Sequence, residues 1–424
     1  MHRLIMNNVG PIKHCDVKID NFTVLTGAQA SGKSTIAKSI FFFRTIKDDI
    51  LDMLLKKSIT NPSMSFKKLV TRQLRNKFLQ IFGSSRAMDN NLLMRYEYSE
   101  DTYVEITLKF DEGANYISPN YVFFDFSRNI SNFLSEYSSK SESEFSKSEL
   151  VTALNQLFAD EYETIFIPAG RSLITLLTTQ LNYIFTVMDE EQKRTIDFCT
   201  QKYVERILRI RSVFDEGIHG YLDTKRRTSI EVINTKLAKK CILLIDSILK
   251  GKYVFVSGEE RLIIGNDRYV KINFTSSGQQ ETVWIFNILM YQLINGTKTF
   301  LILEEPEAHL YPNAQKGILE LLALFMSGDN STLITTHSPY ILGATNNLLY
   351  ANSLTQTINK AEVESIVDAD YQIASCDAYF VKNGKIECCF DVEYNLIKNE
   401  VIDGASEDIN KIFDQLIELT NGDS

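Results

Sequence analysis

Eight consecutive residues, Gly27 to Ser34, have the spacing of a phosphate-binding loop. They fit the pattern G-x-x-x-x-G-K-[ST], in which backbone N–H groups surround a polyphosphate and the two glycines allow close approach of the backbone. In this pattern Lys33 reaches the β- and γ-phosphates, and the hydroxyl of Ser34 binds Mg²⁺. A β-type run at 22–26 precedes the loop and a helical pattern follows it at 35–41, so the loop is expected at a helix N-terminus, which favours anions.

Two carboxylates follow a second β-type run that begins at Thr299. Four apolar residues in a row (300–303) predict a buried, parallel strand. Glu304 and Glu305 then stand at its C-terminal end, where ligands bind in open α/β sheets. One carboxylate can join the shell of a Mg²⁺ ion, and the other can orient and deprotonate the water that attacks a γ-phosphate.

A third apolar run, 331–336, ends at His337, and a polar loop lies at 275–281. A lone histidine is most often structural, but this one is expected to end a strand parallel to the strand of Glu304, where it can sense the γ-phosphate. The polar loop precedes an apolar helix expected at 282–293. An anion-binding helix start and an ordinary N-cap fit this loop equally well.

The composition is that of a globular protein that binds no membrane. The chain has 424 residues, 44% hydrophobic and 23% charged, and a net charge of −9, which argues against a surface that coats nucleic acid. Its six cysteines show no C-x-x-C spacing and are expected to be mostly buried thiols in a reducing compartment. Neither a signal peptide nor a transmembrane run is expected, so the predicted location is cytoplasmic.

The remaining pattern predicts an α/β fold with insertions. Helices are expected over 46–82 with a break at Asn61-Pro62, antiparallel strands over 93–126, and a mobile loop at 135–147. Basic residues gather on a helix face at 67–77 and in a probable loop at 225–227, mainly as solvated charge. The predicted segments are 1–45 (phosphate-binding part), 46–163 (helical and antiparallel insertion), 164–250 (a strand and a helical insertion), 251–360 (second part of the nucleotide-binding fold) and 361–424 (C-terminal extension).

The ordered motifs GAQASGKS, TSSGQQE, FLILEEPEAHL and TTHSP resemble those of ABC-type ATPases of the SMC, RecF and OLD-like group, which belong to the AAA family ATPases. The stretch IPAGRS and the residues from Asp377 onward are similar to a branch of bacterial defence and repair ATPases typified by PtuA and AriA. The resemblance covers residues 1–45 and 251–424. It implies an ABC-type P-loop ATPase head: a mixed β-sheet with flanking helices, an antiparallel β subdomain and a helical insertion.

The resemblance also implies roles for single residues. Glu305 would be the catalytic base, assisted by Lys33 and the switch histidine His337, while Ser34 and Glu304 would bind the metal. Residues 275–279 would be the signature loop, in which Ser276 and Gly278 contact the γ-phosphate of ATP held by a partner subunit. Residues 308–310 would be the D-loop. Ser277 departs from the usual second glycine, and Glu304 from the aspartate of transporters. The expected cofactors are ATP and Mg²⁺, and the expected ATP contacts are Gly27, Ala28, Ala30, Ser31, Gly32, Lys33, Ser34, Thr35, Ser276, Ser277, Gly278 and Gln279.

The expected function is ATP-dependent switching: slow, regulatory hydrolysis of ATP to ADP and phosphate in a head-to-head dimer or higher oligomer. In the first hypothesis the chain is a scaffold and sensor of an anti-phage defence system and controls a separate effector, a nuclease in the simplest case. About 85 residues follow His337 without a compact acidic cluster, so we expect no nuclease domain in this chain. In the alternative, a RecF/SMC-like repair ATPase, DNA is the partner and binds the basic faces with a steep salt dependence.

Overall fold

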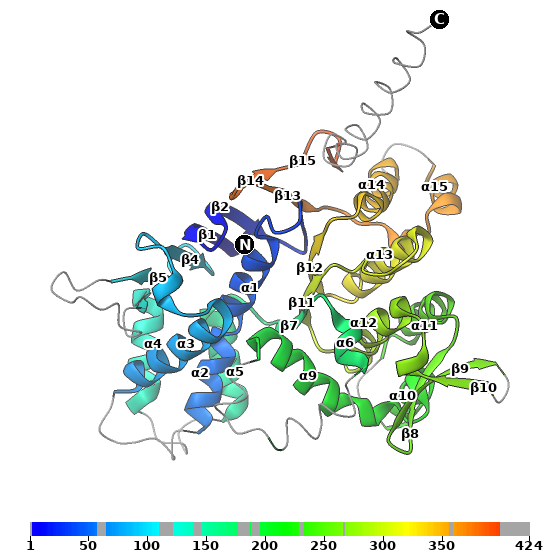
Figure 1. The fold of residues 1–424 in the computed structure, drawn as a ribbon, viewed down its shortest axis with the longest axis horizontal. Helices are drawn as coiled ribbons and strands as arrows, with labels where there is room; N and C mark the ends of the chain where they lie inside the picture. Colours follow the sequence, from blue (N-terminus) through cyan, green and yellow to red (C-terminus); the bar gives the residue numbers. More distant parts are fainter. Residues whose placement is uncertain are drawn as a thin grey trace, which may run out of the picture.

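The computed structural model describes residues 2–56, 65–109, 122–139, 146–176, 187, 196–228, 233–265, 268–355 and 359–398. An eleven-stranded mixed sheet runs through the molecule in the order β6-β5-β4-β1-β2-β14-β13-β3-β12-β11-β7 (Figure 1). Its strands are β1 (His2–Val9), β2 (Ile12–Ile19), β3 (Phe22–Gly27), β4 (Leu93–Glu97), β5 (Tyr103–Leu108), β6 (Val122–Phe126), β7 (Glu163–Ile167), β11 (Thr299–Glu304), β12 (Ser331–Thr336), β13 (Asp377–Lys382) and β14 (Lys385–Cys388).

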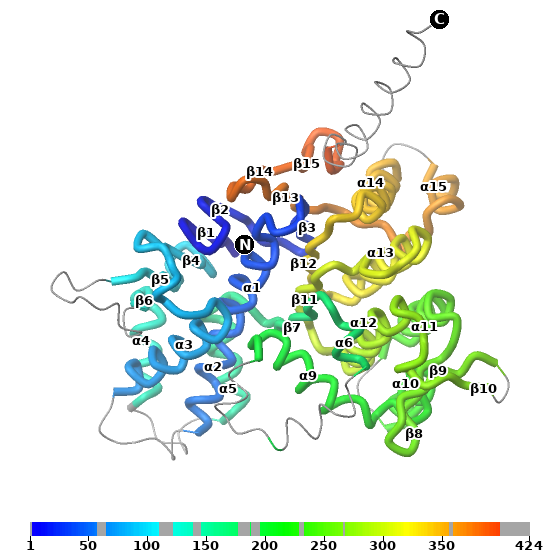
Figure 2. The backbone as a smooth tube through the Cα atoms, viewed as in Figure 1, coloured from blue at the N-terminus to red at the C-terminus, as the bar shows by residue number. Residues whose placement is uncertain are grey.

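The sheet has a parallel half and an antiparallel half. Strands β13, β3, β12, β11 and β7 are parallel neighbours, whereas β1, β2, β4, β5 and β6 form antiparallel pairs. Figure 2 shows that this order interleaves distant parts of the chain, with β13 beside β3 and β11 beside β7. The fold prediction, a mixed α/β sheet with flanking helices, is confirmed.

Helices cover the sheet in two groups (Figure 1). The first group lies with the N-terminal strands: α1 (Lys33–Arg44), α2 (Ile46–Leu55), α3 (Phe66–Phe82), α4 (Arg128–Ser139) and α5 (Lys147–Leu157). The second group comprises α6 (Arg171–Leu176), α9 (Phe198–Ile210), α10 (Gly217–Thr228), α11 (Thr235–Leu249), α12 (Ser277–Ile294), α13 (Pro312–Met326), α14 (Pro339–Leu354) and α15 (Lys360–Ile366). Beside the second group lie two small antiparallel sheets, formed by β8 (Lys252–Val256), β9 (Glu259–Gly265) and β10 (Arg268–Lys271), and by β15 (Phe390–Asp391) and β16 (Leu396–Ile397).

The buried strand at 299–304 shows why its apolar run is continuous. Phe300 and Ile302 belong to the core on the side of α1 to α5, whereas Leu301 and Leu303 belong to the core on the side of α9 to α14. A strand covered on both faces needs apolar residues at every position, because successive side chains point to opposite faces.

Three expectations about local structure were wrong. The predicted loop at 135–147 is helical in its first part, because α4 continues to Ser139 and buries Phe133 and Leu134. Lys225 to Arg227 form the last turn of α10 rather than a loop. The helix expected from 282 begins at Ser277, so the polar loop supplies its first turn. The predicted break at Asn61-Pro62 lies outside the described residues.

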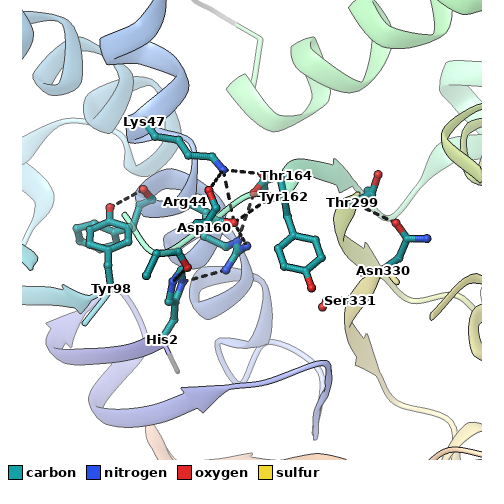
Figure 3. A network of polar contacts seen from close by, with 12 residues as sticks. His2, Arg44, Lys47, Tyr98, Asp160, Tyr162, Thr164, Thr299, Asn330 and Ser331 are labelled. Atoms are coloured by element: carbon teal, nitrogen blue, oxygen red, sulfur yellow. Dashed lines mark hydrogen bonds and ion pairs between the residues drawn. The ribbon is translucent and has the colours of Figure 1, made fainter. Parts of the chain in front are cut away.

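A buried ionic network joins the start of β1 to α1 and α2 (Figure 3). Asp160 accepts a hydrogen bond from Arg44 at 2.8 Å and lies 3.4 Å from the ammonium of Lys47, and all three side chains are at most 6% exposed. Arg44 also lies 2.9 Å from Nδ1 of His2 and 3.8 Å from the ring centre of Phe300.

We expect Asp160→Ala to lower the free energy of unfolding by about 3–5 kcal/mol, because it leaves two buried cations without their counterion. Denaturant unfolding measures the change. Asp16→Ala is the matched control: it removes an ion pair with Arg3 whose side chains are about 40% exposed, and it should cost less than about 1 kcal/mol. An equal loss in both variants would contradict this account of the network.

The same network predicts a pH dependence. Burial, helped by the positive charge of Arg44, lowers the pKa of His2 to about 4. The unfolded chain therefore takes up a proton near pH 6.5 that the folded chain does not bind, so stability is lost as pH falls from about 6.5 to 4, by about 3 kcal/mol for this group. The free energy of unfolding, measured at several pH values in this range, should fall less steeply with decreasing pH for His2→Gln than for the wild type. An equally steep fall would contradict the prediction.

Candidate functional site

The phosphate-binding loop lies between β3 and α1, as predicted. Gly27, Ala30 and Gly32 all have positive φ, at 143°, 59° and 109°. A Cβ on Gly27 would lie 2.3 Å from the carbonyl oxygen of Val381, and one on Gly32 would lie 2.4 Å from Ile12. Gly27 therefore needs glycine on steric grounds as well as for φ, because it meets backbone, and Gly32 needs glycine for its φ.

The other loop residues present their groups at the start of α1. Ala28, Ala30 and Ser34 are exposed, whereas the hydroxyl of Ser31 is buried and has no hydrogen-bond partner among the residues described. Thr35 is half-buried in the first turn of the helix. The free N–H groups of such a turn can bind an anion.

Lys33 bonds the carbonyls of its own loop. Its ammonium donates to the carbonyl oxygens of Gly27 and Ala28, both at 2.9 Å, and lies 3.3 Å from Nδ1 of His337. Burial lowers the pKa of Lys33, and the negative charges of Glu305, Glu307 and Glu304 oppose this shift. A bound phosphate would offer stronger, charged acceptors than these carbonyls.

The structure brings three predicted residues from separate segments into one chain of contacts. His337 lies 3.3 Å from Lys33 through Nδ1 and 3.3 Å from the carboxylate of Glu305 through Nε2. Glu305 itself has a φ of 44°, a conformation that costs of order 1–3 kcal/mol in a residue with a Cβ. Its backbone is held by the N–H bond to the carbonyl oxygen of Thr335 at 2.9 Å.

Glu304 is buried beside the loop that follows β7. One carboxylate oxygen accepts from the backbone N–H of Ala169 at 3.2 Å, and the other, Oε1, is buried with no hydrogen-bond partner in the described part of the chain. Oε2 of Glu307 is orphaned in the same way. Buried carboxylate oxygens without donors fit a divalent cation and its water shell, as does the exposed hydroxyl of Ser34.

The predicted signature residues lie at the start of α12. Ser276 is its N-cap: Oγ accepts from the N–H of Gln279 at 3.4 Å, and the side chain of Gln279 accepts from the N–H of Ser276 at 3.0 Å. Ser276 and Ser277 are exposed, and Gly278 packs against the D-loop, where a Cβ would lie 2.8 Å from the carbonyl oxygen of His309. The N-cap interpretation is thus confirmed. The cap uses the N–H of Gln279 and leaves the N–H groups of Ser277 and Gly278 for an anion.

The structure does not bring the signature residues to the phosphate-binding loop of the same chain. The start of α12 is tied to the residues after β7, since Glu281 accepts from the N–H groups of Arg171 and Ser172 at 3.2 and 2.9 Å. The phosphate-binding loop follows β3. Three strand spacings, about 14 Å, separate β3 from β7 across the sheet.

The sequence interpretation missed three features of the site. Glu307 accepts from the hydroxyl of Thr336 and the N–H of His337, at 2.7 and 2.8 Å, and so fixes the turn after β12. Arg171 is wholly buried behind Glu304 and Glu305. A cavity of about 840 Å³ is lined by Ser34, Thr35 and Phe82, among other residues. The third acid of the EEPE run was a usable signal for Glu307, whereas the cavity depends on elements far apart in sequence.

Comparison with known proteins adds to this picture. The family described as AAA ATPase domain matches residues 1–342. No curated protein matches the chain. Within the described ranges, every helix is too short or too polar to span a bilayer.

The chain is also similar to solved SMC heads. An SMC head bound to the C-winged helix domain of ScpA has 13% identity and a TM-score of 0.39, over 91% of this chain and 95% of that one. A head with an extended coiled coil, bound to the C-terminal domain of ScpA, derives from Pyrococcus furiosus and has 12% identity and a TM-score of 0.39 over 92% and 96%. The SMC head domain from Thermotoga maritima has 13% identity and a TM-score of 0.36 over 91% and 97%. These values are too low to support a functional argument.

Proposed function

The chain belongs to the AAA ATPase domain family, and on this premise we propose that it is an ABC-type ATPase in which two copies hold ATP between them. The observation that carries the proposal is the contact chain Lys33–His337–Glu305, which lines the C-terminal edge of the parallel strands beside the phosphate-binding loop. Ligands of open α/β sheets bind at this edge.

The residues divide the work of hydrolysis. Lys33 moves from its loop carbonyls to the β- and γ-phosphates, and the N–H groups at the start of α1 hold the phosphates in place. Glu305 accepts a proton from the attacking water, and His337 keeps its carboxylate beside the γ-phosphate. Ser34 and Glu304 would hold Mg²⁺, which would neutralise charge on the phosphates. We place the nucleoside in the cavity lined by Ser34 and Thr35, because this cavity adjoins the start of α1.

A second copy supplies the signature loop. Ser276 and Ser277 are exposed at the start of α12, next to Gly278 and Gln279. A two-fold dimer would place this loop on the ATP held by the partner. ATP then changes how two copies sit on each other, and hydrolysis reverses the change. This arrangement supports a regulatory ATPase with slow turnover.

Exposed aromatic residues accompany the motifs at this edge. Phe274 precedes the signature loop and Tyr311 follows the D-loop, and they are 75% and 76% exposed. Tyr340, in the first turn of α14 after His337, is 57% exposed. Exposed aromatic side chains beside polar groups are typical of protein interfaces.

We expect the double substitution Phe274→Ser, Tyr311→Ser to weaken ATP-dependent dimerisation at least about tenfold and leave the monomer folded. Analytical ultracentrifugation with ATP, in the Glu305→Gln background, measures the dissociation constant. Ile366→Ser is the control, because Ile366 is 85% exposed on α15, which carries none of the site residues. Equal dimerisation of all three proteins would contradict the interface.

In the cell, we propose that the dimer is a scaffold and sensor of an anti-phage defence system that controls a separate effector, such as a nuclease. This part of the proposal rests on the motif resemblance described above and on the net charge of −9. For the DNA alternative, the basic face on α3 is smaller than the sequence indicates. Lys77 is buried and paired with Asp49, which leaves Lys67, Lys68 and Arg72 exposed there.

Affinity purification of the tagged chain from its own host, followed by native mass spectrometry, tests the cellular role. The Glu305→Gln variant is purified in parallel to hold the ATP-bound state. A stoichiometric nuclease or toxin on an ATPase oligomer would establish the scaffold. Recovery with DNA and repair proteins would replace it with the DNA clamp, and charge reversal at Lys68, Arg72 and 225–227 should then abolish DNA binding.

A further inference from the structure

Arg171, at the turn between β7 and α6, is wholly buried. It contacts the backbone of both Glu304 and Glu305. Its guanidinium donates to the carbonyl oxygens of Glu304 at 2.6 Å and Glu305 at 2.9 Å. It also donates to the carbonyl oxygen of Pro168 at 2.7 Å. The planar fork of arginine suits such a set of fixed acceptors, and a lysine ammonium cannot reproduce it.

The same guanidinium is bound to the start of α12. Nε donates to the carbonyl oxygen of Glu281 at 3.1 Å and lies 3.1 Å from its carboxylate, which is 1% exposed. The hydroxyl of Thr175 donates to the carbonyl oxygen of Gln280 at 2.9 Å. Gln280 and Glu281 directly follow Gln279, so the chain itself joins the signature residues to this ion pair.

Glu305 needs such support. Its φ of 44° turns the chain out of β11 so that the carboxylate meets His337, and its carbonyl oxygen accepts from Arg171 and from the N–H of Ala308 at 3.1 Å. Without Arg171, one of these two bonds is lost and the peptide between Glu304 and Glu305 is freer to relax.

We infer that Arg171 is a positioning residue that couples the signature loop to the catalytic base. When a partner's nucleotide contacts Ser276 to Gln279, the shift of α12 reaches Glu305 through the pair Glu281–Arg171 and sets the carboxylate for proton transfer. The inference rests on the proposed function and adds to it the path by which one site senses whether ATP is clamped.

Arg171→Lys tests the coupling. It keeps the buried positive charge but loses the fork, and we expect kcat for ATP to fall about 10²-fold, the usual effect of misplacing a catalytic group by about 1 Å. KM for ATP and ATP-dependent dimerisation should stay within about threefold of wild type. Arg44→Lys is the matched control: it changes an arginine that is 4% exposed and bonded to Asp160, His2 and Thr164, away from the site.

Several results would overturn the inference. One is a kcat for Arg171→Lys within about threefold of wild type; another is a loss no larger than that of Arg44→Lys at equal folded fraction. A double variant gives a further test in single-turnover assays. Adding Arg171→Lys to Glu305→Gln should lower the residual hydrolysis rate less than about twofold, since both substitutions act on one step. A loss in the double variant equal to the product of the two single losses would contradict the inference. Full activity of Glu305→Gln would instead refute the proposed base, so the two failures are distinguishable.

Discussion

Glu305→Gln is expected to lower ATP hydrolysis by about 10²–10⁴-fold while the protein still binds ATP, because an amide cannot accept the proton of the attacking water. The substitution preserves the size of the side chain and can keep a hydrogen bond to His337, now 3.3 Å from the carboxylate. The ATP-bound state should therefore accumulate, and with it the dimer. Phosphate release in the steady state and sedimentation with ATP measure the two effects.

A control separates the base from the surrounding acids. Glu307→Gln removes a carboxylate that accepts from Thr336 and from the backbone of His337. It should therefore disturb the turn after β12 but leave the carboxylate of Glu305 in place. We expect a smaller loss of turnover than in Glu305→Gln. Full turnover of purified Glu305→Gln would remove the base assignment.

Lys33→Ala is expected to weaken ATP binding by about ten- to a hundredfold, the range for losing a charged hydrogen-bond donor to phosphate. Lys33 is buried, and its bonds within the described residues are to loop carbonyls and His337, so the fold should tolerate the change. Isothermal titration with Mg-ATP measures the affinity. Lys18→Ala, an exposed lysine on β2, should bind ATP as wild type does, and equal affinity of the two variants would contradict the role of Lys33.

The parts of the site that sequence reasoning could place are those in which local order fixes the structure. A glycine-containing loop between a strand and a helix, and acids directly after a buried strand, keep their geometry in any α/β sheet, so Lys33 and Glu305 could be positioned in advance. The sequence could also place His337, because this residue follows an apolar run expected to be parallel to the strand of Glu304. The structure pairs the two strands, β12 and β11, in parallel.

The remaining features depend on tertiary contacts that no spacing encodes. Arg171 reads as one residue of a short polar turn until β7 is placed beside β11 and α12 packs over it. Lys77 reads as part of a basic face until α2 brings Asp49 within reach. The start of α12 was predicted too late because Ser277 to Glu281 carry no apolar period, although the capping pair Ser276 and Gln279 already indicated it.

The central claim, that each ATP site is completed by a second copy, is tested most directly by mixing two inactive variants. Lys33→Ala weakens phosphate binding at the chain's own loop. Ser277→Asp places a negative charge at the exposed start of α12. This charge is favourable at a helix N-terminus but repels the γ-phosphate of the ATP that the partner holds. A mixed dimer then has one intact site, so an equal mixture should recover up to about a quarter of the wild-type rate. A mixture that dimerises yet stays as inactive as either variant alone would contradict the shared site.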